Sequence, residues 1–294
     1  MIDIDAYLES KRELVNRSLF QFLPVGAPSV LTAAMRYNLE AGGKRLRPVL
    51  TLATTEAIGA GNESVINIAC AVEMVHTYSL IHDDLPAMDD SDLRRGVPTC
   101  HKVYGEAVAV LTGDAFLTLA FDIIARYGLI EGNADKAVKI SAKLAEAAGT
   151  KGMIGGQVFD LLAEGKDLAL DDVEKIASLK TGALLKAAVT CGAIAAGASK
   201  NQLKLLEEFA GSIGTAFQII DDLLDYEGTC EEIGKPVGSD QARLKATYPA
   251  LLGIEKARAK TEKLYHDALE ALEKLDCPTE LLAALAHKLV YRAN

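Results

Sequence analysis

The chain has 294 residues, 50% of them hydrophobic, so it is long enough to bury a large core. Its formal net charge of −10 at pH 7 argues against non-specific nucleic-acid binding, because DNA and RNA phosphates repel an acidic protein. The five widely spaced cysteines, none in a CxxC pair, argue against a disulfide framework and against a zinc site.

The N-terminus and the longest apolar run bear on location. Residues 1–14 lack a basic segment followed by an apolar one, so no secretory signal is expected. The longest apolar run, around residues 187–198, is shorter than the roughly 20 residues that a transmembrane helix needs. No linker rich in Pro, Gly or Ser divides the chain. We therefore expect one domain over residues 1–294, located in the cytoplasm and without stable membrane insertion.

Hydrophobic periodicity predicts helix through most of the chain. Apolar residues recur at three- and four-residue spacing in residues 5–22, 28–40, 64–82, 106–127, 134–150, 171–178, 182–197, 201–226, 246–274 and 278–291. Alternating strand patterns are scarce, so the expected fold class is all-α. Residues 106–121 and 183–198 are apolar around much of the helix and should be central and buried. The expected architecture is a single large helical bundle with a central cavity, a common place for a ligand site.

A glycine pair followed by three cations occurs at residues 42–48, GGKRLRP. The glycines permit a sharp turn, and Lys44, Arg45 and Arg47 follow it. The P-loop pattern GxxxxGK[ST] is absent from the chain. From these residues alone, an anion site and an ordinary basic loop remain equally open.

An apolar helix at residues 76–82 is followed by an acidic cluster. Five aspartates occur within ten residues, and two arginines come directly after them: Asp83, Asp84, Asp89, Asp90, Asp92, Arg94 and Arg95. A divalent cation would relieve the repulsion among the carboxylates, and Mg²⁺ prefers oxygen ligands and bridges to phosphate. Arginine forks are suited to phosphate. The pattern therefore predicts a site for a metal and a phosphate group.

The end of that helix supports this interpretation. Pro86 cannot continue a regular helix, and Leu85 before it is biased away from helical angles, so the helix should end near Asp84. Carboxylates at a helix C-terminus are disfavoured by the macrodipole unless a cation compensates. A solvated acidic loop remains an alternative. A calcium EF-hand does not, because DDSDLRRG lacks its alternating ligands, its glycine and its terminal Glu.

Three later segments carry further candidates. Glycines are dense at residues 152–156, which indicates close packing or a break beside a cavity. Gln157 and Asp160 follow and share a helical face. Lys180 and Thr181 are expected at the start of the helix at 182–197, where they would favour an anion. Residues 218–225, QIIDDLLD, carry a second acidic cluster, which could hold one metal–phosphate group together with the first: Asp221, Asp222 and Asp225.

The motifs DDLPAMD and DDLLD resemble the two aspartate-rich motifs of the polyprenyl diphosphate synthases, the trans-prenyltransferases. DDxxxxD followed by LRRG resembles the bacterial farnesyl-forming and plant-type geranylgeranyl-forming members. The resemblance covers about residues 25–290. Ser91 departs from it, since many relatives have another Asp there. The resemblance implies an isoprenoid-synthase-type helical bundle, Mg²⁺ as cofactor and a homodimer.

The resemblance also implies a role for each candidate residue. Isopentenyl diphosphate would be bound by Lys44, Arg47, His76 and Arg95, with Arg45 a lesser candidate. The allylic diphosphate would be bound by Arg94, Lys180, Lys235 and Lys245. Gln157 and Asp160 would support the site, and Thr181 and Gln218 would face the developing carbocation. Mg²⁺ would be bound by Asp83, Asp84, Asp89, Asp221 and Asp225. His82 is expected to support the metal ligands rather than bind substrate, and Arg292 could cover the site.

Tyr78 bears on product length. It lies five positions before Asp83, about 7.5 Å along a helix axis, and Ser79 shares a face with Asp83. A prenyl chain whose diphosphate is held at Asp83 would pass this turn, where a large side chain would close the pocket. An aromatic residue here resembles the farnesyl-forming members, whereas many geranylgeranyl-forming members have a smaller one. The alternative is that Tyr78 is simply a core residue.

The chemistry implied is ionisation of an allylic diphosphate, attack by the isopentenyl double bond and loss of a proton, in a pocket that excludes water. Two condensations, from dimethylallyl and then geranyl diphosphate, would give farnesyl diphosphate. No dedicated general base is visible, and the family is thought to use the departing pyrophosphate.

Three alternatives remain. A geranylgeranyl or geranyl diphosphate synthase would differ only in pocket depth. A terpene cyclase needs no isopentenyl site, so GGKRLRP, LRRG and DDLLD argue against it. A non-catalytic helical subunit would tend to lack acidic or basic site residues, and none of the key positions is missing here.

Overall fold

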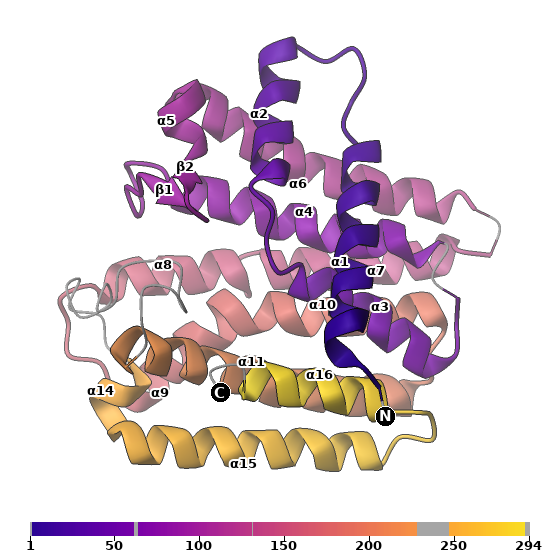
Figure 1. Cartoon of the computed structure of the whole chain (residues 1–294), viewed down its shortest axis with the longest axis vertical. Helices are drawn as coiled ribbons and strands as arrows, with labels where there is room; N and C mark the ends of the chain where they lie inside the picture. Colours follow the sequence, from indigo (N-terminus) through magenta and orange to yellow (C-terminus); the bar gives the residue numbers. More distant parts are fainter. Residues whose placement is uncertain (1, 62–63, 131, 228–246, 292–294) are drawn as a thin grey trace.

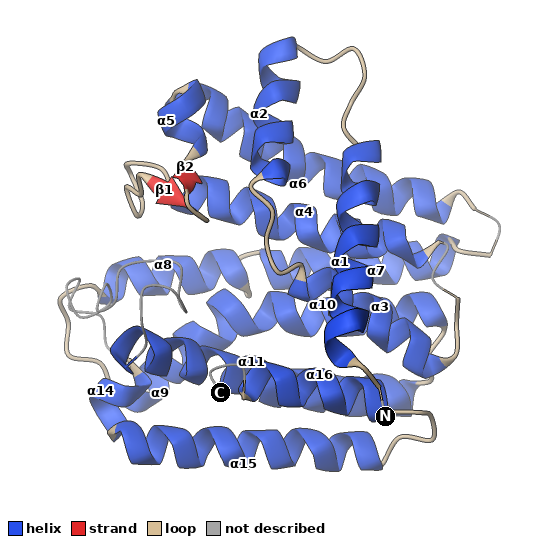
Figure 2. Ribbon diagram, viewed as in Figure 1, coloured by secondary structure: helices blue, strands red, loops and turns tan. Residues whose placement is uncertain are grey.

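The computed structural model describes residues 2–61, 64–130, 132–227 and 247–291. Figure 2 shows that these residues are helical apart from loops and one short hairpin, which confirms the all-α prediction. In chain order (Figure 1) the elements are α1 (Ile4–Gln21), α2 (Ser29–Glu40), α3 (Leu46–Ile58), α4 (Val65–Asp83), β1 (Leu93–Arg94), β2 (Val97–Pro98), α5 (Cys100–Tyr104), α6 (Glu106–Gly128), α7 (Ala134–Ala148), α8 (Met153–Ala163), α9 (Leu170–Ala177), a π-helical turn (Ser178–Gly182), α10 (Ala183–Ala196), α11 (Lys200–Glu227), α14 (Tyr248–Leu252), α15 (Ile254–Glu273) and α16 (Glu280–Val290).

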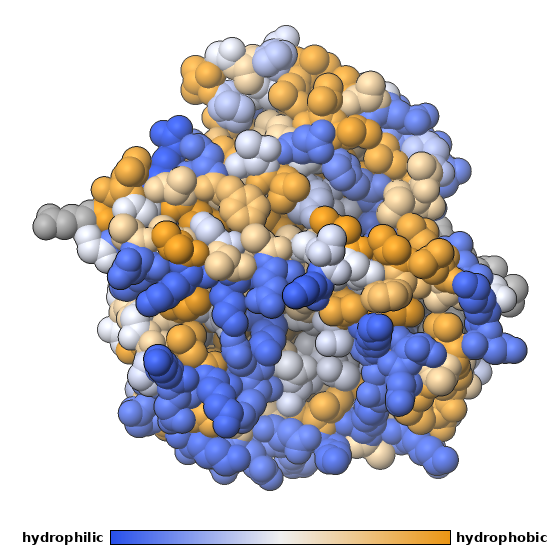
Figure 3. Space-filling view, turned by 180° about the vertical axis from the view of Figure 1, so that it is seen from behind, coloured by the Kyte–Doolittle hydropathy of each residue, from blue (hydrophilic) through white to orange (hydrophobic). Residues whose placement is uncertain are grey.

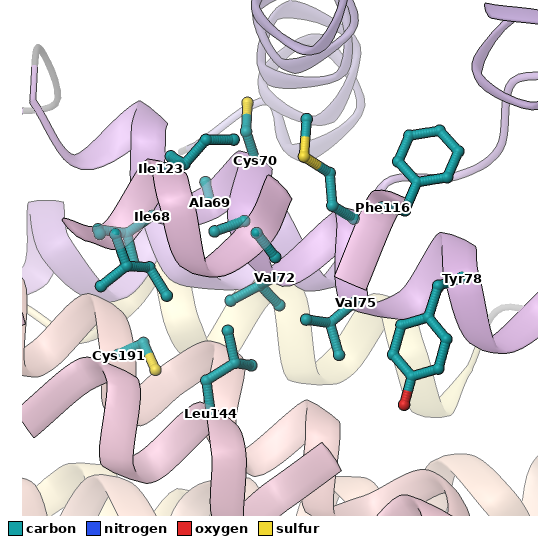
Figure 4. Close-up of a cluster of buried hydrophobic side chains, with 14 of the residues drawn as sticks. Ile68, Ala69, Cys70, Val72, Val75, Tyr78, Phe116, Ile123, Leu144 and Cys191 are labelled. Carbon is teal, nitrogen blue, oxygen red and sulfur yellow. The ribbon is translucent and has the colours of Figure 1, made fainter. Parts of the chain in front are cut away.

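Helices α4 and α10 lie at the centre of the bundle. Helix α4 packs against α3, α6 and α10, and α10 packs also against α7 and α11. Val72 and Val75 of α4 belong to one apolar cluster with Phe116 of α6 and Leu144 of α7, and Figure 4 shows Leu144 pointing towards Val72. A second cluster joins α3 and α10 to α11, α15 and α16, which occupy the lower half of Figure 1.

The burial prediction for the two most apolar helices is half right. Helix α10 is buried along most of its length. Helix α6 is buried only along one side, while Val110 and Leu111 on the other side are exposed. Within the described part of the chain, the outer side of α6 is left uncovered. Figure 3, from behind, shows polar side chains gathered along the lower edge and apolar ones mostly above them.

Three helical segments were not predicted, and two predicted ones differ in detail. Helix α3 was missed because most of its residues are buried, so it has no polar face to reveal a period. The short α5 and the glycine-containing α8 were also missed. The predicted helix at 246–274 breaks at Gly253, whose φ of 80° ends α14. Lys180 and Thr181 were expected to open a helix, but they lie inside a continuous helical run, in the π turn.

A hairpin follows the acidic loop. Strands β1 and β2 are antiparallel, with Leu93 opposite Pro98 and Arg94 opposite Val97. Arg95 and Gly96 form the turn with φ of 55° and 81°, the positive values that a tight two-residue hairpin requires. The turn therefore separates the two arginines, so that each one reaches a different part of the site.

Three helical segments in the described residues are long and apolar enough to cross a membrane, judged by length and composition alone. They are Val65–Asp83, Glu106–Gly128 and Leu170–Ala196, whose apolar windows are 67%, 39% and 61% buried inside the bundle. The absence of membrane insertion therefore stays a prediction. The least buried of the three is α6.

Candidate active site

The acidic loop begins where Pro86 predicts the end of the helix. Helix α4 ends at Asp83, and Asp84 caps it. The backbone N–H of Asp89 donates to the carbonyl of Asp83 at 2.8 Å, so the loop folds back and brings these two residues together. Asp90 allows this return with a φ of 45°.

Asp84 is held by Arg94. The arginine Nε and Nη2 lie 3.0 and 2.5 Å from Oδ1 of Asp84, and Nε lies 3.2 Å from Oδ2. Burial raises the pKa of Asp84, and the hydrogen bonds from Arg94 oppose that rise. Arg94 was predicted to bind the allylic diphosphate, and Asp84 to bind Mg²⁺. Because the Asp84 carboxylate is already bound by an arginine, its role as a metal ligand stays a prediction.

Asp83 lies in a crowded electrostatic environment. Burial, together with the nearby carboxylates of Asp89 and Asp84, raises its pKa to about 6, while Lys180 and Arg94 act against the rise. Lys180 comes from the π turn, nearly a hundred residues further along the sequence. The fold therefore brings the predicted allylic-diphosphate lysine next to the first acidic cluster.

Lys180 is positioned by α8. Its Nζ lies 2.6 Å from Oδ2 of Asp160, and both side chains are mostly buried. Gly156 packs against the backbone of Lys180, where a Cβ would overlap with it, so the close packing predicted for this glycine-rich segment is confirmed. The neighbouring Gln157 has a buried Oε1 without a hydrogen-bond partner among the described residues. Thr181 lies next to Lys180 in the π turn and is half-buried.

The second acidic cluster lies near the end of α11. Gln218 donates to Oδ1 of Asp222 at 2.8 Å, and Oδ2 of Asp222 accepts from the backbone N–H of Tyr248 at 3.1 Å. Asp222 therefore fixes α14 to α11. Asp225 is buried and Asp221 is half-buried. The amide of Gln218 is bonded to Asp222, and its role beside the carbocation stays a prediction.

The basic residues line a cavity of about 850 Å³. All four residues assigned to isopentenyl diphosphate contribute to its wall: Lys44, Arg47, His76 and Arg95. They come from three separate stretches of sequence: the loop and first turn of α3, the helix α4, and the β1–β2 turn. Phe217 of α11 also lines the cavity; it was not predicted, because an apolar residue in a helix is most often part of the core.

Arg47 and His76 lie side by side in the wall of this cavity. Arg47 Nη1 is 3.5 Å from Nε2 of His76, and Nε of Arg47 is buried without a partner among the described residues. Burial lowers the pKa of Arg47, and the charges of Glu73 and Asp221 oppose this. Burial and then four nearby arginines lower the pKa of His76 well below its ordinary value, so the ring is neutral. An anion would relieve this crowding of cations.

Arg45 and Arg95 are held in fixed positions. Arg45 is buried and donates to Asn16, Glu73 and the carbonyl of Leu39, so it anchors the loop at the wall of the cavity. Its lesser rank as a ligand stays a prediction. Arg95 donates to the carbonyl of Gly42. Gly43 must be glycine, because a Cβ would overlap with the Arg95 guanidinium and its φ is 135°.

Tyr78 and Ser79 lie one turn above the acidic loop. The Tyr78 side chain is only 5% exposed, and its hydroxyl has no hydrogen-bond partner among the described residues. Ser79 Oγ donates to the carbonyl of His76 at 2.8 Å, so its hydroxyl serves the helix backbone. Tyr78 belongs to the main apolar cluster, in agreement with the core interpretation, and its role in closing the pocket stays a prediction.

Several predictions are not tested by the geometry. Lys235, Lys245 and Arg292 lie outside the described residues. In the described part of the chain, no three His, Cys, Asp or Glu side chains come close enough to form a metal site by themselves. Glu73, the buried partner of Arg45, was missed, although a lone glutamate in an otherwise apolar helix could have indicated a buried ion pair.

Comparisons with known proteins agree on the family to which this chain is similar. The family model described as polyprenyl synthetase matches residues 28–286. The chain is 44% identical over 292 residues to a farnesyl diphosphate synthase of Geobacillus stearothermophilus, covering 99% of this chain and 98% of the relative. It is 45% identical over 289 residues to a geranylgeranyl diphosphate synthase of Cyanophora paradoxa, covering 98% and 96%.

A solved structure agrees with these relatives. The crystal structure of an FPP/GFPP synthase from Zymomonas mobilis superposes with a TM-score of 0.86 at 36% identity, covering 99% of this chain and 98% of that one. Both the sequence match and the structural match extend over nearly the whole chain. The chain therefore belongs to the polyprenyl synthetase family and is a prenyltransferase.

Proposed function

We propose that this prenyltransferase is a Mg²⁺-dependent farnesyl diphosphate synthase. It would join isopentenyl diphosphate to dimethylallyl diphosphate and then to geranyl diphosphate, releasing pyrophosphate each time. The observation that carries the proposal is the cavity of about 850 Å³ with Lys44, Arg47, His76 and Arg95 in its wall. These residues place several cations around one diphosphate group. The acidic cluster beside them suits a second diphosphate group, bound through Mg²⁺.

The acidic residues fit Mg²⁺. Burial, and then the nearby carboxylates of Asp89 and Asp84, raise the pKa of Asp83 to about 6, and a bound cation would stabilise its ionised form. Mg²⁺ is typically bound in such sites by one or two carboxylates together with waters and substrate phosphates. Asp83 and Asp89 are the favoured ligands, joined by Asp221 and, with less support, by Asp84 and Asp225.

Each part of the reaction is supported by residues of this chain. Bound Mg²⁺ would act as a Lewis acid and neutralise the leaving pyrophosphate. Lys180, held by Asp160, and Arg94, held by Asp84, would stabilise the negative charge that develops as the allylic carbon–oxygen bond breaks. Arg47 and Arg95 would hold isopentenyl diphosphate so that its double bond attacks the allylic carbon. Proton loss to the departing pyrophosphate would complete the condensation.

Product length is the finer part of the proposal, and it rests on Tyr78. Its buried ring lies one turn above Asp83, where it would stop a growing chain at fifteen carbons. The second candidate is a geranylgeranyl diphosphate synthase, because a relative with that name is as similar to this chain as the farnesyl-forming one. The two differ in product and not in chemistry.

Product analysis tests the proposal. The purified chain is incubated with isopentenyl and dimethylallyl diphosphates and Mg²⁺, and the prenyl alcohols are identified after phosphatase treatment. Mainly farnesol is expected. Mainly geranylgeraniol would preserve the enzyme class and overturn the role of Tyr78. No condensation and no pyrophosphate release would instead indicate a non-catalytic subunit.

The metal is tested with matched variants of one loop. EDTA should abolish condensation, and Mg²⁺ should restore it. Asp83→Asn should lose most activity, whereas Asp92→Asn should lose little, because Asp92 is exposed and paired with Lys102 at 2.7 Å. Equal losses in the two variants would argue against a specific metal role for Asp83.

We also infer a cytoplasmic homodimer of single-domain chains. Helix α6 supports this, because its apolar window is only 39% buried within one chain, and Val103, Val110 and Leu111 lie exposed on or next to it. Leu111→Glu should shift the sedimentation coefficient to that of a monomer. Leu251→Glu, which changes an exposed leucine on α14, should not. A monomeric parent chain would refute the inference.

A further inference from the structure

The imidazole of His82 fills a slot in α6. It lies against Gly113, where a Cβ would overlap with the ring, so the slot exists only because residue 113 is glycine. His82 Nε2 is 3.0 Å from the carbonyl oxygen of Val110, one turn before Gly113. Helices α4 and α6 pack extensively along their length. The ring is therefore fixed from the α6 side by shape and by a polar contact.

His82 in turn contacts Tyr78. The two residues are four apart on α4 and share a face. Their ring centroids are 5.7 Å apart with an interplanar angle of 75°, an edge-to-face pair. Figure 4 shows the Tyr78 ring running away from Phe116 of α6. His82 therefore contacts Gly113 on one side and the Tyr78 ring on the other.

We propose that His82 and Gly113 are positioning residues for Tyr78 and so determine product length together with it. Gly113 admits the imidazole, the imidazole supports the tyrosine ring, and the ring closes the prenyl pocket. An edge-to-face contact with His82 favours one orientation of the Tyr78 ring over the others by about 2- to 12-fold. A change of this size is enough to alter the ratio of C20 to C15 product. This inference rests on the proposed function, because it requires Tyr78 to close the pocket.

The test compares product ratios among variants of the full chain. His82→Ala removes the support without overpacking α6, and Gly113→Ala expels the imidazole from its slot. Each should raise the ratio of C20 to C15 product by about 2- to 12-fold. His82→Phe, which keeps a ring beside Tyr78, should retain more C15 product than His82→Ala. The product ratio is measured instead of the rate, because His82 is next to the proposed metal ligand Asp83 and its replacement can also change the rate.

Gly128→Ala is the matched control for Gly113→Ala. It places the same methyl group on α6 at another tight position, where a Cβ would lie 2.8 Å from that of Ala137 on α7. It should lower the melting temperature and leave the product ratio unchanged. A ratio that changes equally in both glycine variants would mean that general loosening of α6 is responsible, and would overturn the proposal.

Double variants separate this inference from the proposed function. In a His82→Ala background, Gly113→Ala should have no further effect on the product ratio, because the slot is already empty. In a Tyr78→Ala background, neither change should matter. If Tyr78→Ala itself leaves the product unchanged, the pocket-closing role fails. If Tyr78→Ala lengthens the product but His82→Ala does not, only the positioning inference fails.

Discussion

Arg45 and Glu73 form a buried ion pair beneath the diphosphate-binding loop. Arg45 Nη1 lies 2.8 Å from Oε1 of Glu73, and the two side chains are 1% and 2% exposed. Nε and Nη2 of Arg45 also donate to Asn16 and to the carbonyl of Leu39, each at 2.9 Å. The pair therefore ties together α1, α4 and the end of α2 at the point where Lys44 and Arg47 enter the cavity.

Glu73→Ala should strongly destabilise the protein. It leaves the Arg45 guanidinium buried without its carboxylate, which typically costs about 3–5 kcal/mol. The free energy of unfolding in urea measures the effect. Glu9→Ala is the matched control, because it breaks the exposed pair with Arg12 and should cost no more than about 1 kcal/mol. Similar losses for the two variants would show that the buried pair is not a structural anchor.

His76 should make stability depend on pH. Folding lowers its pKa well below the ordinary 6.5, first through burial and then through the charges of Arg47, Arg95, Arg94 and Arg45. Below pH 6.5 the unfolded chain binds a proton at His76 that the folded chain does not. The stabilisation is therefore complete above pH 6.5 and is lost as the pH falls, by at most about 1.4 kcal/mol per pH unit.

The His76→Gln variant isolates this contribution. Urea unfolding of the parent and the variant at pH 7.5, 6.5 and 5.5 should show the parent losing stability relative to the variant below 6.5. The raised pKa of Asp83 acts with the opposite sign, but it is present in both proteins and cancels in the difference. His266→Gln, at an exposed position on α15, should give a profile parallel to that of the parent. A parallel profile for His76→Gln as well would contradict the prediction.

The fold class and the chemistry-bearing residues could be predicted from sequence because they leave local signals. Pro86 correctly placed the end of α4 at the acidic loop. Charge made Lys44, Arg47 and Arg95 candidates, and the structure brings them into one cavity. Local signals could not distinguish Arg45, which turns inward, from its neighbours, because its direction depends on the buried Glu73.

Other features depend on contacts between distant segments. The π turn at Ser178–Gly182 contains no residue that marks it as different from an ordinary helix. A boundary between two helices was therefore predicted there from the sequence. The slot for His82 depends on Gly113 in another helix, and a glycine inside an apolar helix gives no indication of what lies against it. Such features follow from packing, which the order of residues in one segment does not reveal.

Lys180 should matter far more than the residue that holds it. Lys180→Gln removes a cation from the leaving group and should lower kcat/KM for geranyl diphosphate by about 10²–10³. Asp160→Asn weakens only a partly exposed ion pair of 2.6 Å and should cost no more than about fivefold. Steady-state kinetics with both substrates varied measures these effects. Lys186→Gln, six residues further along and near Glu207, should leave kcat/KM unchanged. A loss for Asp160→Asn equal to that for Lys180→Gln would mean that Asp160 acts on the substrate or metal directly.

Tyr78→Phe should distinguish the contribution of the Tyr78 ring to product length and stability from that of its hydroxyl. Burial and then the charge of Asp83 raise the pKa of Tyr78, so the hydroxyl is neutral, and it has no partner among the described residues. Its removal should therefore keep the C15 product and raise stability by about 1 kcal/mol. Tyr78→Ala should lengthen the product and cost about 3–5 kcal/mol, because it empties a buried aromatic site. Product chromatography and urea unfolding give both readouts. A longer product from Tyr78→Phe would show that the hydroxyl, and not the ring volume, stops chain growth, because the phenyl ring still fills the same space.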